Sequence, residues 1–393
     1  MTTTQLEVDL LDPTLYQRNP HDVWAWMREH EPVYRDHRNG VWGVTRHADL
    51  VRVERDDATF SSRGIYRWVP SPDEETMISH DNPQHLAQRR LVMGRFTPKA
   101  VGAREPEIRA LVRELVDAFV DDGEVEVVEA LAAQLPARFT CRLLGVPEER
   151  WADLKSWSER QMRLDTRGRD PKIWHDFYAS GEEMFRAVYE LLPERIGCPM
   201  NDLLSVWANA EIDGRRLPPA TAMHEFGLFV SGGAETTRTT IAHGLRAFCD
   251  HPDQWELLAR EPERIPAAVE EVIRWVTPLN QMFRRATVDT ELAGTPISAG
   301  DRLALLYPSA NRDEDVFADP MTFDVTRDPN PHVAFGNGTH FCLGAFVARQ
   351  TLRSMLEEMT SRLTELHAVA EPDVEPNVFA RAVRTFRMGF TRR

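Results

Sequence analysis

Amphipathic helical periodicity governs the chain from about Gln84 onward, and it constrains the fold more than any other sequence feature. Apolar residues recur there at the three- and four-residue spacing that gathers them on one helical face. Segments with this pattern lie around residues 108–119, 181–192, 218–248, 252–260, 266–275 and 345–363. A mainly α-helical protein is expected.

Shorter strand-like segments flank the helical pattern. Residues 32–45 predict two strands about an Asn39-Gly40 turn, since that dipeptide accepts the positive φ angles of a tight hairpin. Further β segments are expected at 288–307 and near 385–391, whereas 64–82 appears irregular. We therefore expect one domain over 1–393, with β-rich portions at roughly 30–60, 285–310 and 370–393 and helices in the remainder.

Charge and composition exclude several classes of protein. A formal net charge of -15 disfavours nonspecific binding to nucleic acid or anionic membranes. No stretch approaches the roughly 18 apolar residues of a membrane span, and the polar, acidic N-terminus does not resemble a signal peptide. Four scattered cysteines form neither a disulfide framework nor a zinc motif. A cytoplasmic monomer without membrane or nucleic-acid partners is expected.

One cysteine has a distinctive setting, in the run Phe335-Gly-Asn-Gly-Thr-His-Phe-Cys342-Leu-Gly344 just before an expected helix at Ala345. A helix N-terminus stabilises a thiolate, so we expect a lowered pKa and a capacity to ligate a metal. Gly336, Gly338 and Gly344 would let this loop lie flat against a planar cofactor. A cysteine near glycines is more often an ordinary buried thiol, so other motifs must decide.

A second motif, Ser231-Gly-Gly-Ala-Glu-Thr-Thr237, lies inside the long apolar segment 218–248. Each glycine costs a helix roughly 1 kcal/mol relative to alanine. The pair Gly232 and Gly233 would open a groove for a small polar ligand such as dioxygen, with Glu235 and Thr236 delivering protons. A kink that packs against another helix is the alternative.

Charged residues form a third set. Glu271 and Arg274 lie three apart on one helical face and suit an ion pair, which in most proteins is only solvated surface. Arg284 and Arg327 follow downstream, in Arg-Arg-Ala and in Phe-Asp-Val-Thr-Arg. None of these carries mechanistic weight alone.

Together and in this order, the motifs from His85 to the C-terminus resemble the cytochrome P-450 superfamily. The cysteine loop agrees with that family's Phe-Gly-x-Gly-x-His-x-Cys-x-Gly pattern at every fixed position. The resemblance implies a single-domain, mainly α fold with small peripheral sheets. It also implies haem b, held between the glycine-containing helix and the helix after Cys342. Framework segments are similar to actinobacterial members that oxidise sterols or branched lipids.

The resemblance also implies roles for individual residues. Cys342 would be the thiolate ligand of the iron, within a loop that includes Phe335, Gly336 and Gly344. His85, Arg89, Arg284 and His340 would pair with the two haem propionates. Thr236 and Glu235 would be the catalytic alcohol and acid. Glu271, Arg274 and Arg327 would form a structural charge cluster that holds the cysteine loop.

A substrate pocket is expected from segments near these motifs. Its candidate residues are mostly apolar: Trp68, Val69, Leu228, Phe229, Gly232, Gly233, Leu279, Asn280, Met282 and Phe379. They favour a hydrophobic substrate, with a sterol, terpenoid or lipid preferred. Four nearby arginines, Arg63, Arg67, Arg381 and Arg384, leave an anionic aromatic substrate as the alternative.

The expected activity is insertion of one oxygen atom of O2, by hydroxylation or oxidative dealkylation. The chain ends soon after its last β segment, so electrons from NAD(P)H are expected through an external ferredoxin and its reductase. Arg89, Arg90, Arg95, Lys99 and Arg349 would form a basic face for an acidic ferredoxin. A peroxide-dependent or non-oxygenase haem-thiolate enzyme, and a haem-thiolate binding or sensing protein without turnover, stay open as alternatives.

Overall fold

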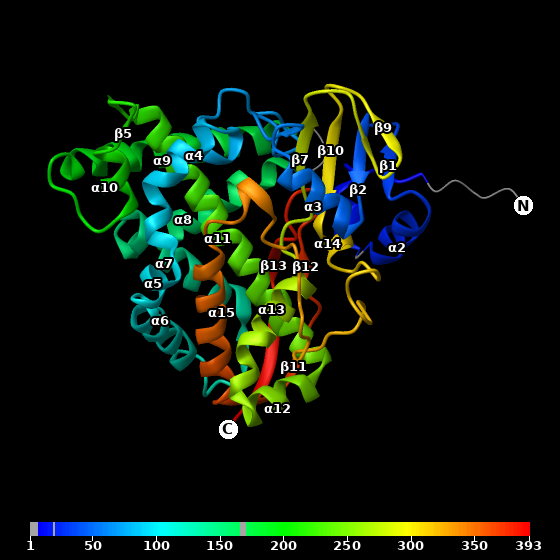
Figure 1. The fold of residues 1–393 in the computed structure, drawn as a ribbon. Coiled ribbons are helices and arrows are strands. Elements are labelled where there is room, and N and C mark those ends of the chain that lie inside the picture. The colour runs from blue at the N-terminus through cyan, green and yellow to red at the C-terminus, as the bar shows by residue number, and fades with distance from the viewer. Residues whose placement is uncertain (1–6, 19, 166–169) are drawn as a thin grey trace, which may run out of the picture.

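The computed structural model describes residues 7–18, 20–165 and 170–393. Helices fill most of the molecule, and a smaller β region lies at one side around β1, β2, β7 and β10 (Figure 1). The helical part is built from segments whose apolar stripes pack on one another, as the periodicity predicts. The expected fold class, mainly α with small peripheral sheets, is confirmed.

Fifteen α-helices lie within the described residues. Their bounds are α1 Pro13–Gln17, α2 His21–His30, α3 His47–Arg55, α4 Gln84–Val92, α5 Pro98–Gly102, α6 Glu105–Asp117, α7 Gln134–Leu144, α8 Trp151–Met162, α9 Pro171–Arg195, α10 Leu203–Ala208, α11 Pro219–Asp250, α12 Pro252–Arg260, α13 Ile265–Val276, α14 Tyr307–Ala310 and α15 Ala345–Thr360. Short 3-10 turns at Met77–Ser79 and Gly338–His340 matter for the site below.

The strands form one five-stranded sheet and several small ones. Their bounds are β1 Val33–Asp36, β2 Val41–Val44, β3 Phe60–Ser61, β4 Glu124–Glu126, β5 Glu211–Ile212, β6 Arg215–Arg216, β7 Gln281–Ala286, β8 Thr290–Leu292, β9 Thr295–Ile297, β10 Arg302–Leu306, β11 Leu363–Ala368, β12 Asp373–Val374, β13 Val383–Thr385 and β14 Arg387–Arg392. The main sheet has the order β1-β2-β10-β7-β3, so the N-terminal hairpin pairs through β2 with β10, from the last third of the chain. β1 and β2 pair antiparallel, and Gly40 between them has a φ of +65°, which confirms the predicted hairpin.

α11 is the central helix of the molecule (Figure 1). It packs against α7, α8, α9 and α13, and its buried residues belong to the largest apolar cluster. The helix runs unbroken through Gly232 and Gly233. α15 follows the cysteine loop and packs against α6 and α13.

Candidate functional site

A cavity of about 260 Å³ separates α11 from the cysteine loop. Its walls come from α4, α7, α11, α13 and α15, from the sheet through Met282 and Arg284, and from the turn at Met77 and Ile78. This cavity therefore collects residues from nearly the whole length of the chain.

The cysteine loop reaches the cavity because its backbone is fixed at both ends. The Cys342 N–H donates to the Phe335 carbonyl oxygen at 2.9 Å. Gly336 and Gly338 have φ angles of +68° and +65°, and a Cβ on Gly338 would collide with the Glu54 carbonyl oxygen. Glycine is thus required there for close approach to α3. Phe335, Gly336, His340, Cys342 and Gly344 all line the cavity.

The pKa of the Cys342 thiol departs from expectation. Burial raises the pKa above its ordinary value, while the Gly344 N–H and the charges of Arg89 and Arg349 act in the opposite direction. The position before α15 predicts a lowered pKa, but in this chain desolvation by the surrounding apolar side chains outweighs the helix terminus. That expectation is corrected.

Four nitrogen-bearing side chains, His85, Arg89, Arg284 and His340, gather at one end of the cavity. The His85 and His340 rings lie 4.2 Å apart. Burial, together with neighbouring positive charge, lowers the pKa of both histidines, that of His340 to about 2. His340 Nε2 is buried without a hydrogen-bond partner among the described residues. The two guanidinium groups and the orphaned His340 nitrogen suit negatively charged groups. Both ring nitrogens of His85 already lie at carbonyl oxygens, those of Met77 and Thr339.

Haem, the cofactor that the sequence resemblance implies, fits this arrangement. The thiol at one wall could ligate the iron, and the nearby N–H groups could donate hydrogen bonds to two propionates. The orphaned His340 nitrogen supports this fit because a buried polar atom ordinarily has a partner. The residues present therefore suit haem in position and in chemistry.

Glu54 on α3 is a site residue that the sequence analysis missed. Its carboxyl group is 4% exposed, lines the cavity and lies 3.7 Å from Arg284 Nη2. The Tyr307 hydroxyl donates to it at 2.6 Å. Burial raises the pKa of Glu54 to about 7. No local sequence pattern predicts a role for this glutamate, because Glu54 on α3 and Arg284 on β7 come together only when α3 packs against the main sheet.

Thr236 and Glu235 are neighbours in sequence with different surroundings. Thr236 lines the cavity, and its hydroxyl donates to the Gly232 carbonyl oxygen at 2.9 Å. Glu235 is 2% exposed, does not line the cavity, and lies 3.4 Å from Arg238 Nη1. Burial raises the pKa of Glu235, and the Arg238 charge opposes that rise.

The two glycines of α11 have separate surroundings. A Cβ on Gly232 would meet nothing within 4 Å, so this residue leaves open space. A Cβ on Gly233 would lie 2.8 Å from Thr140 Oγ1, so this residue lets α7 approach α11. The groove interpretation therefore applies to Gly232, and the helix-packing interpretation applies to Gly233.

Six of the ten expected pocket residues line the cavity: Leu228, Phe229, Gly232, Gly233, Leu279 and Met282. Trp68, Val69, Asn280 and Phe379 do not. Trp68 packs against Phe283 and Arg302 instead, and the Asn280 side chain donates to the Asn377 carbonyl oxygen. Residues that the sequence analysis missed include Phe96, Phe139, Leu143 and Leu144, from helices that approach α11 only in the folded chain.

The four arginines considered for an anionic substrate also lie elsewhere, since none of them is among the described residues that line the cavity. Arg67 donates to the Gln161 carbonyl oxygen and lies over the Phe379 ring, and Arg384 pairs with Glu375 at 3.1 Å. Arg63 is exposed. Burial lowers the pKa of Arg381 to about 10.

Glu271, Arg274 and Arg327 come together below the cysteine loop. Arg274 makes two hydrogen bonds of 2.7 Å to Glu271, and Arg327 Nε donates to Glu271 at 3.2 Å. Glu271 also accepts from the Asp324 N–H and the Asn330 amide. Both Glu271 and Arg274 are fully buried, so this pair belongs to the interior rather than to the solvated surface.

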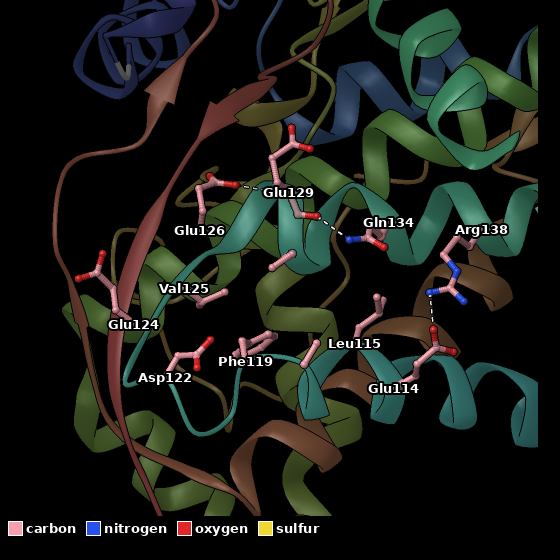
Figure 2. Close-up of a pocket in the computed structure, with 12 residues that line it drawn as sticks. Glu114, Leu115, Phe119, Asp122, Glu124, Val125, Glu126, Glu129, Gln134 and Arg138 are labelled. Atoms are coloured by element: carbon pink, nitrogen blue, oxygen red, sulfur yellow. Dashed lines mark hydrogen bonds and ion pairs between the residues drawn. The ribbon is translucent and has the colours of Figure 1, made fainter. Parts of the chain in front are cut away.

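A second, more open pocket of about 580 Å³ lies between α6, β4 and α7 (Figure 2). Its polar groups bind one another: Arg138 pairs with Glu114 at 2.9 Å, and the Glu129 N–H donates to Glu126 at 2.5 Å. None of the expected site residues lines it. The cavity at Cys342 is therefore the candidate functional site.

Neither a membrane-spanning helix nor a multi-residue metal site is found among the described residues. No helix among them is long and apolar enough to cross a membrane. No group of three or more His, Cys, Asp or Glu side chains among them could hold a metal ion. Haem iron needs only one thiolate from the protein, so the lack of a three-residue metal site does not bear on haem binding.

Comparison with known proteins gives consistent matches. Residues 166–385 match the family model described as cytochrome P-450. The chain is 40% identical to a steroid C26-monooxygenase of Mycobacterium tuberculosis, over 94% of this chain and 93% of that protein. A steroid C26-monooxygenase of Rhodococcus jostii is 34% identical, over 97% and 84%.

Solved structures agree with this result. A cytochrome P-450 of Mycobacterium marinum in complex with pseudoionone superimposes with a TM-score of 0.90 at 32% identity, covering 99% of this chain and 100% of that one. A Bacillus megaterium enzyme in complex with testosterone gives a TM-score of 0.88 at 29% identity, covering 95% and 99%.

Proposed function

Because this chain belongs to the cytochrome P-450 family and is a haem-dependent monooxygenase that uses O2, we propose that its substrate is a sterol-like hydrophobic molecule. We propose further that a ferredoxin supplies its electrons. Hydroxylation or oxidative dealkylation at one carbon would be the outcome.

The distribution of polarity in the cavity carries the substrate proposal. Its charged residues Glu54, Arg89 and Arg284 gather with the histidines at the end suited to haem carboxylates. The part facing α7 and α11 is lined mainly by apolar side chains: Phe96, Phe139, Leu143, Leu144, Leu228, Phe229, Leu279 and Met282. An apolar wall of this kind favours a hydrophobic ligand and disfavours an anionic one. The relatives named as steroid monooxygenases and the testosterone-bound structure support the same substrate class.

The proposed roles follow from the positions of the side chains. Haem, when bound, supplies the iron at which dioxygen is activated. Cys342 would hold the iron, and His85, Arg89, Arg284 and His340 would hold the propionates. The Thr236 hydroxyl would donate a hydrogen bond to oxygen in the cavity. If Thr236 passes its proton to that oxygen, Glu235 would replace the proton after leaving Arg238.

A ligand panel tests the substrate class. Sterols, terpenoids, fatty acids and substituted aromatic acids would be added to the haem-loaded enzyme, with the spin-state shift of its absorption spectrum as the readout. We expect sterols to give the largest shift, followed by product formation with NAD(P)H, a surrogate ferredoxin and its reductase. A shift only with aromatic acids would contradict the proposal. Product formed only with peroxide would favour the peroxide-dependent alternative.

The thiolate assignment has its own test. Reduced wild-type protein with carbon monoxide should absorb at the long-wavelength Soret position of thiolate-ligated haem, and Cys342→Ser should lose that band. The matched control is Cys249→Ser, which replaces a cysteine outside the cavity. An unchanged spectrum in Cys342→Ser would remove this residue as the ligand.

A mixed apolar and basic surface supports the ferredoxin proposal. Leu86 and Met93, on and just after α4, are 37% and 46% exposed, and Phe346 on α15 is 41% exposed. Arg90 and Lys99 are exposed beside them without an ion pair among the described residues. Arg349, which was expected in this basic face, is instead paired with Glu270 at 2.7 Å. Complementary charge would orient an acidic ferredoxin here.

A further inference from the structure

The outer face of α9 carries aromatic side chains that the described part of the chain leaves partly or largely exposed. Trp174, Tyr178, Phe185 and Tyr189, which we call the α9 stripe, follow one another at spacings of four, seven and four residues. Such spacing places them on one side of a helix. Tyr178, Phe185 and Tyr189 are 61%, 49% and 70% exposed. α9 lies at the edge of the molecule beside α10, away from the main sheet (Figure 1).

The stripe is an ordered surface rather than scattered exposure. Trp174 stacks on Tyr178 with ring centroids 6.0 Å apart, and Phe185 stacks on Tyr189 at 6.4 Å. The opposite side of α9 is the one that packs into the protein, through Ser180, Met184, Ala187 and Val188. Ile196 and Met200, just after the helix, extend the apolar surface with exposures of 50% and 55%. Contiguous apolar patches of this kind mark interaction sites.

The charges beside the stripe favour a second copy of this chain as its binding partner. Glu182 and Arg186 lie four residues apart on one flank of the stripe, and both are exposed. No hydrogen bond or close ion pair of either side chain is found among the described residues, and the charge of Arg186 acts within α9 only on Glu183. If a second α9 lies antiparallel about a two-fold axis level with Met184, Glu182 faces Arg186 of the second copy, and the reverse pair forms by symmetry. A two-fold contact must be self-complementary in this way.

The aromatic positions obey the same symmetry. Phe185 lies almost level with the axis and meets its own copy, while Tyr178 lies opposite Tyr189 of the second copy. A Cβ on Gly181 would meet nothing within 4 Å, which leaves room in the stripe for a ring from the other helix. The charged and the aromatic side chains of the stripe are therefore both self-complementary in an antiparallel pair of α9 helices.

We propose that this chain forms an antiparallel two-fold dimer through the α9 stripe. Its 25 residues span about 37 Å, and a helix is roughly 10 Å wide, so the contact is smaller than the ~800 Å² per partner of a standard stable interface. The dimer is therefore weak and depends on protein concentration. Acidic residues outnumber basic ones on α9, which opposes an anionic lipid surface as the alternative occupant.

Sedimentation velocity of the full-length protein over a wide range of concentration tests the dimer. Phe185→Ala should weaken dimerisation by about tenfold or more, since a central interface aromatic is costly to truncate. Val288→Ser, at a residue that is 54% exposed beyond β7, is the matched control and should leave dimerisation unchanged. Thermal unfolding verifies that each variant is folded.

Charge reversal tests the antiparallel geometry. Glu182→Arg and Arg186→Glu should each weaken the homodimer, because like charges then face each other. The double variant, and an equimolar mixture of the two single variants, should restore dimerisation. A monomer at every concentration, a dimer unaffected by these changes, or a mixture that fails to associate would overturn the proposal. Flotation of monomeric wild type with phosphatidylcholine–phosphatidylglycerol vesicles, lost in Phe185→Ala, would assign the stripe to lipid instead.

Discussion

At the scale of single residues, Glu225 is a buried acid whose only hydrogen-bond partner in the described chain is a backbone group. It lies on α11 with 1% exposure, and it accepts from the Met77 N–H at 2.7 Å. The adjacent His224 accepts from the Glu75 N–H at 3.0 Å. Met77 lines the cavity, so these two side chains tie the segment over the cavity to α11. Burial, aided by the Glu74 charge, raises the pKa of Glu225 to about 8.

Glu225→Gln should change the pH dependence of folding stability. A folded-state pKa raised above the unfolded value of about 4.5 means that the stability contribution is complete below pH 4.5 and is lost as pH rises towards 8. Glutamine keeps the acceptor for Met77 without the charge. The variant should therefore gain on the order of a few kcal/mol relative to wild type between pH 4.5 and 8. Urea denaturation across this range measures the difference. If the unfolding free energies of Glu225→Gln and wild type changed with pH in the same way, a raised pKa of Glu225 would be excluded.

Thr236 allows a second test at this scale. Thr236→Ala removes a hydroxyl that faces the cavity, so NAD(P)H consumption should continue while product formation falls, by about tenfold or more. Thr237→Ala, the neighbouring cavity residue, is the matched control and should keep the two coupled. The measured quantity is product formed per NAD(P)H consumed, and an unchanged ratio in Thr236→Ala would exclude a role for this hydroxyl.

Sequence motifs located the cavity residues that stand in fixed patterns. Cys342, His340 and Thr236 all line the cavity. Glu54 and Phe139 could not be found in this way, because each reaches the cavity only through the packing of its helix against a distant segment. Trp68, which was expected in the pocket, packs against Phe283 and Arg302 and is not among the residues that line the cavity, for a related reason. An apolar side chain in an irregular segment can pack toward either side of that segment, and the sequence alone does not determine which side it takes.

At the scale of elements, α7 and α11 pack against each other and both line the cavity. Thr140 of α7 rests against Gly233, and Gly232, one position earlier, leaves open space. Adjacent residues of a helix point about 100° apart, so one glycine can serve packing while the other opens space.

Alanine at the two positions should have opposite effects. Gly232→Ala should stabilise the fold by up to about 1 kcal/mol through helix propensity. Gly233→Ala should destabilise it by roughly 1–2 kcal/mol, because its Cβ would press on Thr140. Thr140→Ala combined with Gly233→Ala should recover the loss. Thermal unfolding compares all four proteins, and equal effects of the two glycine substitutions would show that the helices can separate freely.

The Glu271 cluster connects α13 to the segment before the cysteine loop. Glu271→Gln leaves Arg274 buried without its counter-charge and should cost about 3–5 kcal/mol in unfolding free energy. Arg264→Ala, which breaks the exposed pair with Glu261 on the preceding turn, is the control and should change little. Guanidinium denaturation measures both. A small loss in Glu271→Gln would mean that the cluster adds no stability.

Periodicity predicted the amphipathic helices closely, and α12 at Pro252–Arg260 agrees with the expected bounds. It predicted only part of α9, where the uncovered stripe gives the outer side an apolar character as well. α7 was missed. Eight of its 11 residues are buried, and the other three, Gln134, Arg138 and Arg142, recur every four residues on one side, so the helical period was present in the sequence but was not used.

At the scale of the whole molecule, charge is unevenly distributed. The chain carries a net charge of -15, yet Arg90 and Lys99 stand exposed beside apolar side chains near the cysteine loop. For the proposed acidic ferredoxin, long-range repulsion and local attraction would therefore oppose each other, and salt would screen the long-range part more strongly.

Ferredoxin-supported turnover should respond to this local charge. Arg90→Glu together with Lys99→Glu should lower the rate by about tenfold at low salt, and the deficit should shrink as salt is added. The matched control reverses two exposed charges on another face, with Arg215→Glu and Arg216→Glu in β6. Carbon monoxide spectra after chemical reduction should be normal in every variant. An equal loss of rate in the control pair would show that only the overall charge matters.

The unlike surroundings of Gly232 and Gly233 also bear on how such an enzyme diversifies. Two neighbouring codons in one helix are exposed to the same mutation pressure, but only the first faces space that a larger side chain could occupy. Descendants that acquire new substrates can therefore vary position 232 and reshape the cavity, while position 233 stays tied to its contact with α7. Selectivity can drift there without disturbing the helix crossing on which the fold depends.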